Sequence, residues 1–242
     1  MTLRRSLALA VAALAVPIVL AACSSGSSDA ATLPPIPSQV PATPTPAPTH
    51  PGPTFPPGCP TEQPAALGAD DVRTVTITTD KGDIVMEIKG ALSPIAAGNF
   101  VELASCGYYD MVVFHRLVPG FVIQGGDGMF GRSPDIIPDL IGSGGPKYTI
   151  QDEPVTTTYQ RGTVAMARTA QPNSVGSQFF IVTDDAAAQA LGDPQYNNYQ
   201  IIGSVTDGMD VVDAIAAMPN AGPPTNAAID PVPMTKVTVT TP

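Results

Sequence analysis

The chain has 242 residues, which leaves room for one or two domains. Charged residues make up 13% of it, while 28 residues are proline and 22 are glycine, a mixture that suits a loop-rich β domain joined to a segment without a packed core. A formal charge of −10, with no polybasic stretch, argues against binding to nucleic acid or to anionic lipid headgroups.

The first 22 residues have the features of an export signal. Two arginines, Arg4 and Arg5, precede an apolar run over residues 6–19. This run is shorter than the roughly 20 residues that a membrane-spanning helix needs, although an uncleaved membrane anchor is the alternative. The sequence LAAC, ending at Cys23, resembles the lipobox of bacterial lipoproteins. We therefore expect a lipoprotein signal peptide at 1–22, lipidation of Cys23, and an extracytoplasmic protein anchored to the cell membrane by its N-terminal lipid.

Residues 23–70 are predicted to be the lipidated cysteine followed by a disordered linker. This segment is rich in proline, threonine and serine, with 13 prolines between Pro34 and Pro64. It has too little apolar surface to offset the entropy of ordering. Dense proline favours an extended polyproline II chain, which suits a spacer through a layer of the cell envelope. A proline-rich ligand for another protein is the alternative.

Two cysteines remain, Cys59 near the end of the linker and Cys106 just after a predicted helix. Export leads to an oxidising compartment, in which paired cysteines usually form a disulfide. A disulfide would fasten the linker to the domain, and two separate free thiols are the alternative.

The folded domain is expected over residues 71–242, beginning with a hairpin. Residues 72–79 alternate apolar and polar side chains, as a half-buried strand does, and a turn at 81–83 leads to a second strand at 84–88. Ser93 and Pro94 are suited to the N-cap and first position of a helix that ends by Gly107.

The rest of the domain is predicted to be mainly β. A second helix is expected over residues 209–218, and short strands are expected at 112–117, 121–124, 162–167, 178–183, 200–205 and 236–240. Many short strands and two helices without an alternating βαβ pattern indicate a closed antiparallel β-barrel.

Two sequence blocks resemble the cyclophilin family of peptidyl-prolyl cis-trans isomerases. The first is FHRLVPGFVIQGGD (Phe114–Asp127), and the second is GSQFF (Gly176–Phe180), preceded by Met166-Ala167-Arg168-Thr169. Weaker similarities extend the resemblance from Val72 to Val239. It implies a mainly β fold, a closed eight-stranded antiparallel β-barrel capped by two α-helices, with a shallow groove on its outside. In this groove an enzyme would rotate X–Pro bonds of proline-containing peptides and of unfolded or partly folded exported proteins.

The resemblance also implies the site residues. Arg116 matches the catalytic arginine, and the substrate-binding positions are Phe121, Val122, Gln124, Ala167, Arg168, Gln178, Phe180, Leu191 and Tyr199, of which the alignment fixes the last two least closely. Arg168 departs from the asparagine of many eukaryotic members. The chain has no tryptophan, which many members place in the groove, so we expect weak binding of cyclosporin-like cyclic peptides. We also expect a monomer.

The expected chemistry requires no cofactor and no metal, because no bond is made or broken. Rotation about an X–Pro bond faces a barrier of ~18–20 kcal/mol, and a fixed donor such as Arg116 can lower it by bonding the prolyl nitrogen as that atom gains a lone pair. The alternative function is a proline-binding chaperone, scaffold or adhesion module that uses the same groove with incidental catalysis. His115 is interpreted as a barrel histidine, and the glycines at 126–131 as a turn.

Overall fold

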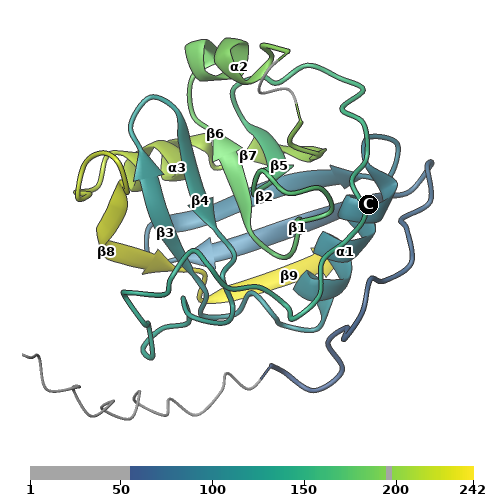
Figure 1. Ribbon diagram of the computed structural model, residues 1–242, viewed down its shortest axis with the longest axis horizontal. Coiled ribbons are helices and arrows are strands. Elements are labelled where there is room, and N and C mark those ends of the chain that lie inside the picture. The colour runs from purple at the N-terminus through teal and green to yellow at the C-terminus, as the bar shows by residue number, and fades with distance from the viewer. Residues whose placement is uncertain (1–54, 195–197) are drawn as a thin grey trace, which may run out of the picture. The chain divides into compact units, whose positions relative to one another are not determined.

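A computed structural model describes residues 55–194 and 198–242. The predictions made for the signal peptide, for Cys23 and for most of the linker lie outside these residues. Within the described ranges the structure has nine strands and three helices (Figure 1). No helix in these ranges is long and apolar enough to span a membrane.

The nine strands form one antiparallel sheet in the order β8-β3-β4-β6-β5-β7-β2-β1-β9. In Figure 1, β3, β4 and β6 lie in front, and β1, β2 and β9 cross behind them, so the sheet curls around a core. The strands are β1 (Val72–Thr79), β2 (Gly82–Lys89), β3 (Val113–Val118), β4 (Val122–Gly125), β5 (Thr163–Met166), β6 (Phe179–Val182), β7 (Ile201–Asp207), β8 (Ala227–Pro233) and β9 (Lys236–Thr240).

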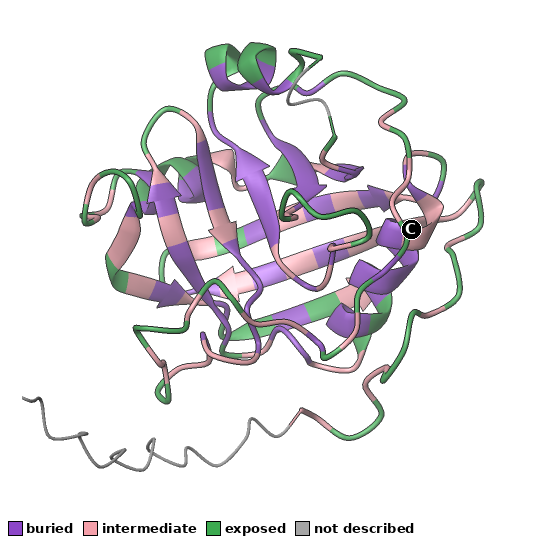
Figure 2. Cartoon of the chain, in the orientation of Figure 1, coloured by how far each residue is buried: buried purple, intermediate pink, exposed green. Residues whose placement is uncertain are grey.

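The predicted N-terminal hairpin is confirmed. Strands β1 and β2 pair with Val75 opposite Met86 and Ile77 opposite Ile84, and these four side chains are buried. Successive side chains of a strand point to opposite faces of a sheet, so these four side chains all face the core. Figure 2 shows this alternation as buried and less buried bands along the strands.

Helix α1 (Pro94–Ser105) packs against β1, β2, β7 and β9, and α3 (Met209–Ala216) packs against β2, β3 and β4. Ser93 holds the predicted N-cap position of α1, but its side chain does not cap the helix. The Glu153 carboxylate does so instead, accepting hydrogen bonds from the backbone N–H groups of Ile95 and Ala96, both at 2.9 Å. A cap that comes from 57 residues away cannot be read from local sequence.

The mainly β class is confirmed, but the prediction of eight strands and two helices undercounted the elements by one strand and one helix. The additional strand is β8, an edge strand that contains Pro231, and proline is tolerated at sheet edges. The additional helix is α2 (Asp185–Leu191), which has only 7 residues and begins where the Asp184 side chain accepts a hydrogen bond from the Ala186 N–H. The two edge strands, β8 and β9, are not paired with each other in the described residues, so we describe the sheet as curled rather than closed.

The packed domain begins before residue 71, where the linker was predicted to end. Residues 55–68, which we call the N-terminal strap, lie against the domain: Phe55, Cys59 and Leu67 contact the core, and the Leu67 N–H donates to the Pro94 carbonyl at 2.9 Å. A disulfide joins Cys59 to Cys106 at the C-terminal end of α1, with the Cα atoms 5.2 Å apart. The strap is thus held covalently and by packing.

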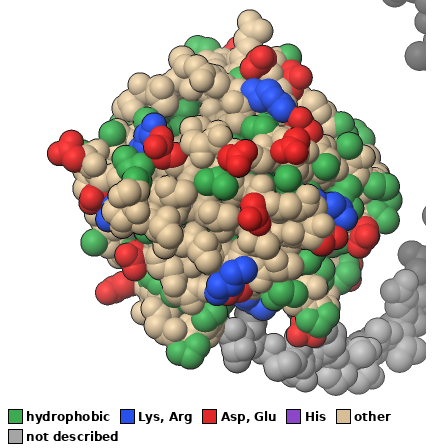
Figure 3. Space-filling model, turned by 180° about the vertical axis from the view of Figure 1, so that it is seen from behind, with side chains coloured by type: hydrophobic (Ala, Val, Ile, Leu, Met, Phe, Trp, Pro, Cys, Tyr) green, Lys and Arg blue, Asp and Glu red, His purple; other side chains and the backbone are tan. Residues whose placement is uncertain are grey.

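Charged side chains are spread rather than gathered on one face of the domain. On the face turned away from the view of Figure 1, acidic and basic side chains alternate among polar and apolar ones, and no basic patch is seen there (Figure 3). All six ion pairs of the described residues join side chains that are at least partly exposed, so each of them contributes little to stability.

Candidate active site

The pairing of three strands brings the most important predicted residues into one row. In the ladder Arg116 of β3 lies opposite Gln124 of β4, and Gln124 lies opposite Phe180 of β6. Residues paired across neighbouring strands point to the same face of a sheet, so these three side chains lie side by side. The Arg116 guanidinium donates a hydrogen bond from Nη1 to Oε1 of Gln124 at 3.2 Å, which holds the guanidinium beside β4.

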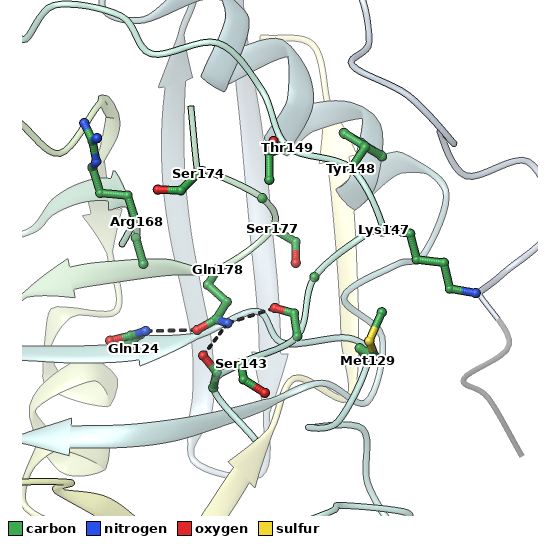
Figure 4. A pocket seen from close by; sticks show the side chains of 15 residues that line it. Gln124, Met129, Ser143, Lys147, Tyr148, Thr149, Arg168, Ser174, Ser177 and Gln178 are labelled. Atoms are coloured by element: carbon green, nitrogen blue, oxygen red, sulfur yellow. Dashed lines mark hydrogen bonds between the residues drawn. The ribbon is translucent and has the colours of Figure 1, made fainter. Parts of the chain in front are cut away.

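Gln178 extends this row through its amide (Figure 4). Its Oε1 accepts a hydrogen bond from Nε2 of Gln124 at 3.0 Å. Its Nε2 donates to the carbonyl oxygens of Gly142 and Gly144, both at 2.9 Å. Arg116, Gln124 and Gln178 are therefore linked side chain to side chain, and the far end of the link rests on the backbone of a loop.

An apolar cluster lies beside the row, separate from the main core. Two neighbouring residues of β6 point in opposite directions: Phe179 packs in the main core, and Phe180 packs in this second cluster. Val122 of β4 and Leu191 of α2 belong to the same second cluster and are 2% and 4% exposed. Beside Gln124, the outer face of β4 and β6 thus carries apolar side chains where polar ones would ordinarily meet water.

A cavity of about 180 Å³ opens over this cluster. Nine of the ten predicted site residues line it: Arg116, Phe121, Val122, Gln124, Ala167, Arg168, Phe180, Leu191 and Tyr199. The tenth, Gln178, lines a neighbouring cavity of about 480 Å³, which shares Gln124, Ala167 and Arg168 with the first. The structure therefore brings all ten residues to one place, although four separate segments of the chain supply them.

Tyr199 is held at the rim by a residue that sequence reasoning missed. The hydroxyl of Tyr159 donates to the Tyr199 carbonyl at 2.8 Å and accepts from the Tyr199 N–H at 3.1 Å. The Tyr199 ring meets the Phe180 ring edge to face, with centroids 5.3 Å apart. Burial raises the pKa of Tyr159 to about 12, so its hydroxyl stays protonated and able to donate at neutral pH. Tyr159 stands in a polar stretch without periodicity, so the sequence carried no signal for this role.

The two arginines of the smaller cavity differ in their charge environment. Arg168 forms an ion pair with Asp152 at 3.1 Å, and it donates to the backbone carbonyl of Gln171 at 3.1 Å. Arg116 takes part in none of the ion pairs found among the described residues. Its guanidinium has five N–H groups, of which the bond to Gln124 uses one, so it retains donors and positive charge for a ligand in the cavity.

This arrangement can bind a small apolar ring and polarise an atom next to it. The cavity is the size of a single side chain, and its walls are apolar on the side of Phe121, Val122 and Phe180. The Arg116 guanidinium stands at one end with unused donors. Such a site can stabilise electron density on an atom of the ligand without supplying a nucleophile or a proton acceptor.

Comparisons with known proteins agree with these observations. A model of the family described as "Cyclophilin type peptidyl-prolyl cis-trans isomerase/CLD" matches residues 74–239. The chain is 33% identical to peptidyl-prolyl cis-trans isomerase A of Dickeya dadantii over 175 residues, which are 69% of this chain and 84% of that protein. It is 37% identical to isomerase B of Escherichia coli over 149 residues, 58% of this chain and 82% of that protein.

A solved structure is similar across the whole length of its own chain. The crystal structure of a cyclophilin-type isomerase of Cryptosporidium parvum, in the presence of the dipeptide Ala-Pro, aligns with a TM-score of 0.57 and 30% sequence identity. The alignment covers 70% of this chain and 99% of that one.

Proposed function

The chain belongs to the cyclophilin-type peptidyl-prolyl cis-trans isomerases, and from this premise we propose which residues perform the isomerisation and where in the cell it takes place. The reaction is rotation about the amide bond that precedes proline. We assign it to the cavity of about 180 Å³, with Arg116 as the catalytic donor. The single observation that carries the assignment is the position of the Arg116 guanidinium, which lines an apolar cavity and pairs with no carboxylate of the described residues.

The proposed mechanism follows from the electronic structure of the amide. Resonance between the carbonyl and the prolyl nitrogen produces the barrier of ~18–20 kcal/mol. As the bond twists, the nitrogen gains a lone pair, which a guanidinium N–H can bond. This bond exists in the twisted state and not in the planar one, so it lowers the barrier and does not merely tighten binding. Phe121, Val122 and Phe180 would hold the proline ring while the acyl group turns.

The amides of Gln124 and Gln178 would serve two purposes. They keep the Arg116 guanidinium in place through the bonds at 3.2 and 3.0 Å, and they offer polar atoms at the edge of the larger cavity to the backbone that precedes the proline. A substrate would thus lie across both cavities, with its proline in the smaller one. Binding of a proline-containing peptide is supported by the crystal structure of the Cryptosporidium relative in the presence of the dipeptide Ala-Pro.

We propose that this isomerase assists the folding of exported proteins outside the cytoplasmic membrane. The lipobox ending at Cys23 and the long proline-rich segment after it support this location. The disulfide between Cys59 and Cys106 supports it as well, because disulfides persist in oxidising compartments. Fractionation of cells that express Cys23→Ala tests the anchor: the variant should leave the membrane fraction, and unchanged membrane association would refute lipidation at Cys23.

The test of the catalytic assignment is protease-coupled isomerisation of an X–Pro peptide. Arg116→Ala should lower kcat/KM on the order of a hundredfold, the loss that accompanies removal of one preorganised donor. Arg116→Lys should recover only part of the rate, because an ammonium group lacks the planar fork that bonds Gln124 and the prolyl nitrogen together. Arg73→Ala is the control, since Arg73 lies on β1 and pairs with Asp71.

The same assay decides between an enzyme and a binding module. The apolar cavity would hold a proline ring with or without Arg116, so a scaffold or chaperone would bind proline-containing peptides equally well in both forms. If Arg116→Ala isomerised the peptide as fast as the wild type, Arg116 would not be the donor. If neither protein exceeded the uncatalysed rate while both bound the peptide, the groove would be a binding module.

A further inference from the structure

One buried carboxylate stands close to the site without any role in the mechanism above. Asp127 is 0% exposed, and it is the only acidic side chain among the buried residues of the described chain. A buried carboxylate requires compensation, and here the compensation comes from backbone N–H groups. Oδ1 accepts from Met129 at 3.0 Å and from Phe130 at 2.9 Å, while Oδ2 accepts from Gly142 at 2.7 Å and from Gly144 at 2.9 Å.

The last two contacts connect Asp127 to the active site. The backbone N–H groups of Gly142 and Gly144 donate to Asp127, and the carbonyl groups of the same two residues accept hydrogen bonds from Nε2 of Gln178. The loop at residues 142–144 is thus held on one side by a carboxylate, and on the other side it holds a groove side chain. In Figure 4 the two dashed lines from Gln178 to this loop mark the second half of the connection.

The donors and acceptors in these hydrogen bonds fix the orientation of the Gln178 amide and then of the Gln124 amide. Because two carbonyl oxygens face the side chain of Gln178, its NH₂ group must point to them and its Oε1 must point to Gln124. Gln124 must then present its own NH₂ to Gln178 and its Oε1 to Arg116. The acceptor that holds the guanidinium is therefore set by the direction of the loop carbonyls.

The glycines of the loop are adapted to this contact. A Cβ atom on Gly144 would lie 2.3 Å from Oδ1 of Asp127, closer than any side chain allows. Gly142 has φ +91°, a backbone conformation that side chains other than glycine rarely adopt. The loop backbone therefore approaches Asp127 directly, without an intervening side chain.

We propose that Asp127 is a positioning residue for the isomerisation. It sets the loop at 142–144, the loop carbonyls set the amides of Gln178 and Gln124, and these hold the Arg116 guanidinium for the prolyl nitrogen. The inference rests on the proposed role of Arg116. Asp127 itself lines neither cavity, while the loop that it holds lines the larger one, so Asp127 acts on the substrate only through this loop and the groove side chains.

A double-mutant cycle on the full chain separates this role from a purely structural one. The variants are Asp127→Asn, Gln178→Ala and the double variant, assayed by protease-coupled isomerisation. Asparagine keeps the shape of the side chain, but it places an NH₂ group against backbone N–H groups. In the wild-type background Asp127→Asn should lower kcat/KM about tenfold, as loss of an orienting residue behind a site does. In the Gln178→Ala background it should have less than a twofold effect, because the connection is already cut.

A matched control comes from another carboxylate that anchors backbone. Oδ1 of Asp110 accepts from the Val237 N–H at 2.9 Å, and Oδ2 pairs with Lys236 at 2.7 Å, away from both cavities. Asp110→Asn should lower thermal stability and leave kcat/KM of the folded protein within twofold of the wild type. Equal losses for Asp127→Asn in both backgrounds would overturn the proposal, since a smaller folded fraction acts independently of Gln178. Full activity of Asp127→Asn would overturn it too.

A second route covers the case in which Asp127→Asn does not fold. Gly144→Ala disturbs the same junction from the loop side, and the same cycle with Gln178→Ala then decides. The proposed role of Arg116 as donor is tested separately. It is wrong if Arg116→Ala keeps the wild-type rate, whatever the double-mutant cycle shows. If Arg116→Ala is slow and the cycle is additive, only the positioning role of Asp127 is wrong.

Discussion

At the scale of single residues, His115 makes the stability of the domain depend on pH. This residue directly precedes Arg116 in the chain and is 6% exposed. Burial lowers the pKa of His115 to about 4, with the nearby Asp127 carboxylate opposing the shift and the Arg116 charge adding to it. The imidazole is therefore neutral in the folded protein at neutral pH, which agrees with a structural rather than a catalytic histidine.

The consequence is a loss of stability on mild acidification. An unfolded chain takes up the proton near pH 6.5, and the folded chain takes it up only near pH 4. Between these values the unfolded state binds more protons, so the free energy of unfolding falls as the pH falls. The expected loss from pH 7 to pH 5 is about 2 kcal/mol. Urea unfolding of the wild type and of His115→Leu at both pH values measures it, and an equal pH dependence of the two proteins would contradict the assignment.

The groove side chains could be predicted from sequence, and the residues behind them could not. Arg116, Gln124 and Phe180 each stand in a sequence block that resembles the cyclophilins, and the resemblance implied their roles. Asp127 stands in the first of these blocks, but its four partners are backbone N–H groups of residues up to 17 positions away. Almost any residue type has a backbone N–H group, so the sequence does not indicate these partners. Tyr159 likewise acts on the backbone of Tyr199, from 40 positions away.

At the scale of elements, the strap and α1 approach each other so closely that one glycine is required. Gly98 lies within α1 and is buried. A Cβ atom there would be 2.3 Å from the Ala65 carbonyl oxygen and 2.8 Å from the Leu67 nitrogen, both backbone atoms of the strap. Glycine therefore permits a backbone-to-backbone contact that no other residue allows.

Gly98→Ala should therefore destabilise the protein, against the usual trend for helices. Alanine is favoured over glycine in a helix interior by roughly 1 kcal/mol, but overpacking of this kind typically destabilises by about 1–3 kcal/mol. We expect a net loss in the free energy of unfolding. Gly145→Ala is the matched control, because a Cβ atom there meets nothing within 4 Å. If Gly98→Ala were as stable in urea as the wild type, the backbone of the strap would not be packed directly against Gly98.

Elements with a clear local pattern were predicted, and those defined by their neighbours were not. The hairpin of β1 and β2 and the apolar face of α3 follow from periodicity alone. Strand β8 has two prolines in 7 residues, so only its pairing with β3 makes it a strand. Helix α2 contains one turn of apolar contacts, with Ala187, Ala188 and Leu191 buried, which is too short for a periodic signal.

At the scale of the whole molecule, the disulfide ties the N-terminal strap to the domain across 47 residues of sequence. Phe55 of the strap packs on the core, with its ring centroid 5.3 Å from that of Tyr108, and the Lys147 ammonium lies 5.2 Å from the centre of the Phe55 ring. Lys147 in turn lines the larger cavity. The disulfide thus holds the segment whose Phe55 contacts one lining residue of the larger cavity.

Loss of this disulfide should destabilise the entire domain rather than the strap alone. The crosslink closes a loop that contains β1, β2 and α1, so its removal increases the entropy of the unfolded chain. The chain-entropy description predicts that the free energy of unfolding then falls by about 4 kcal/mol, and the loss is more commonly about 2–4 kcal/mol in practice. Urea unfolding with and without reductant measures the change. The variant Cys59→Ser/Cys106→Ser should match the reduced wild type and should not respond to reductant. If reductant left the wild-type midpoint unchanged under conditions in which both thiols are shown to be free, the crosslink would add nothing to stability, and packing of Phe55 and Leu67 alone would hold the strap.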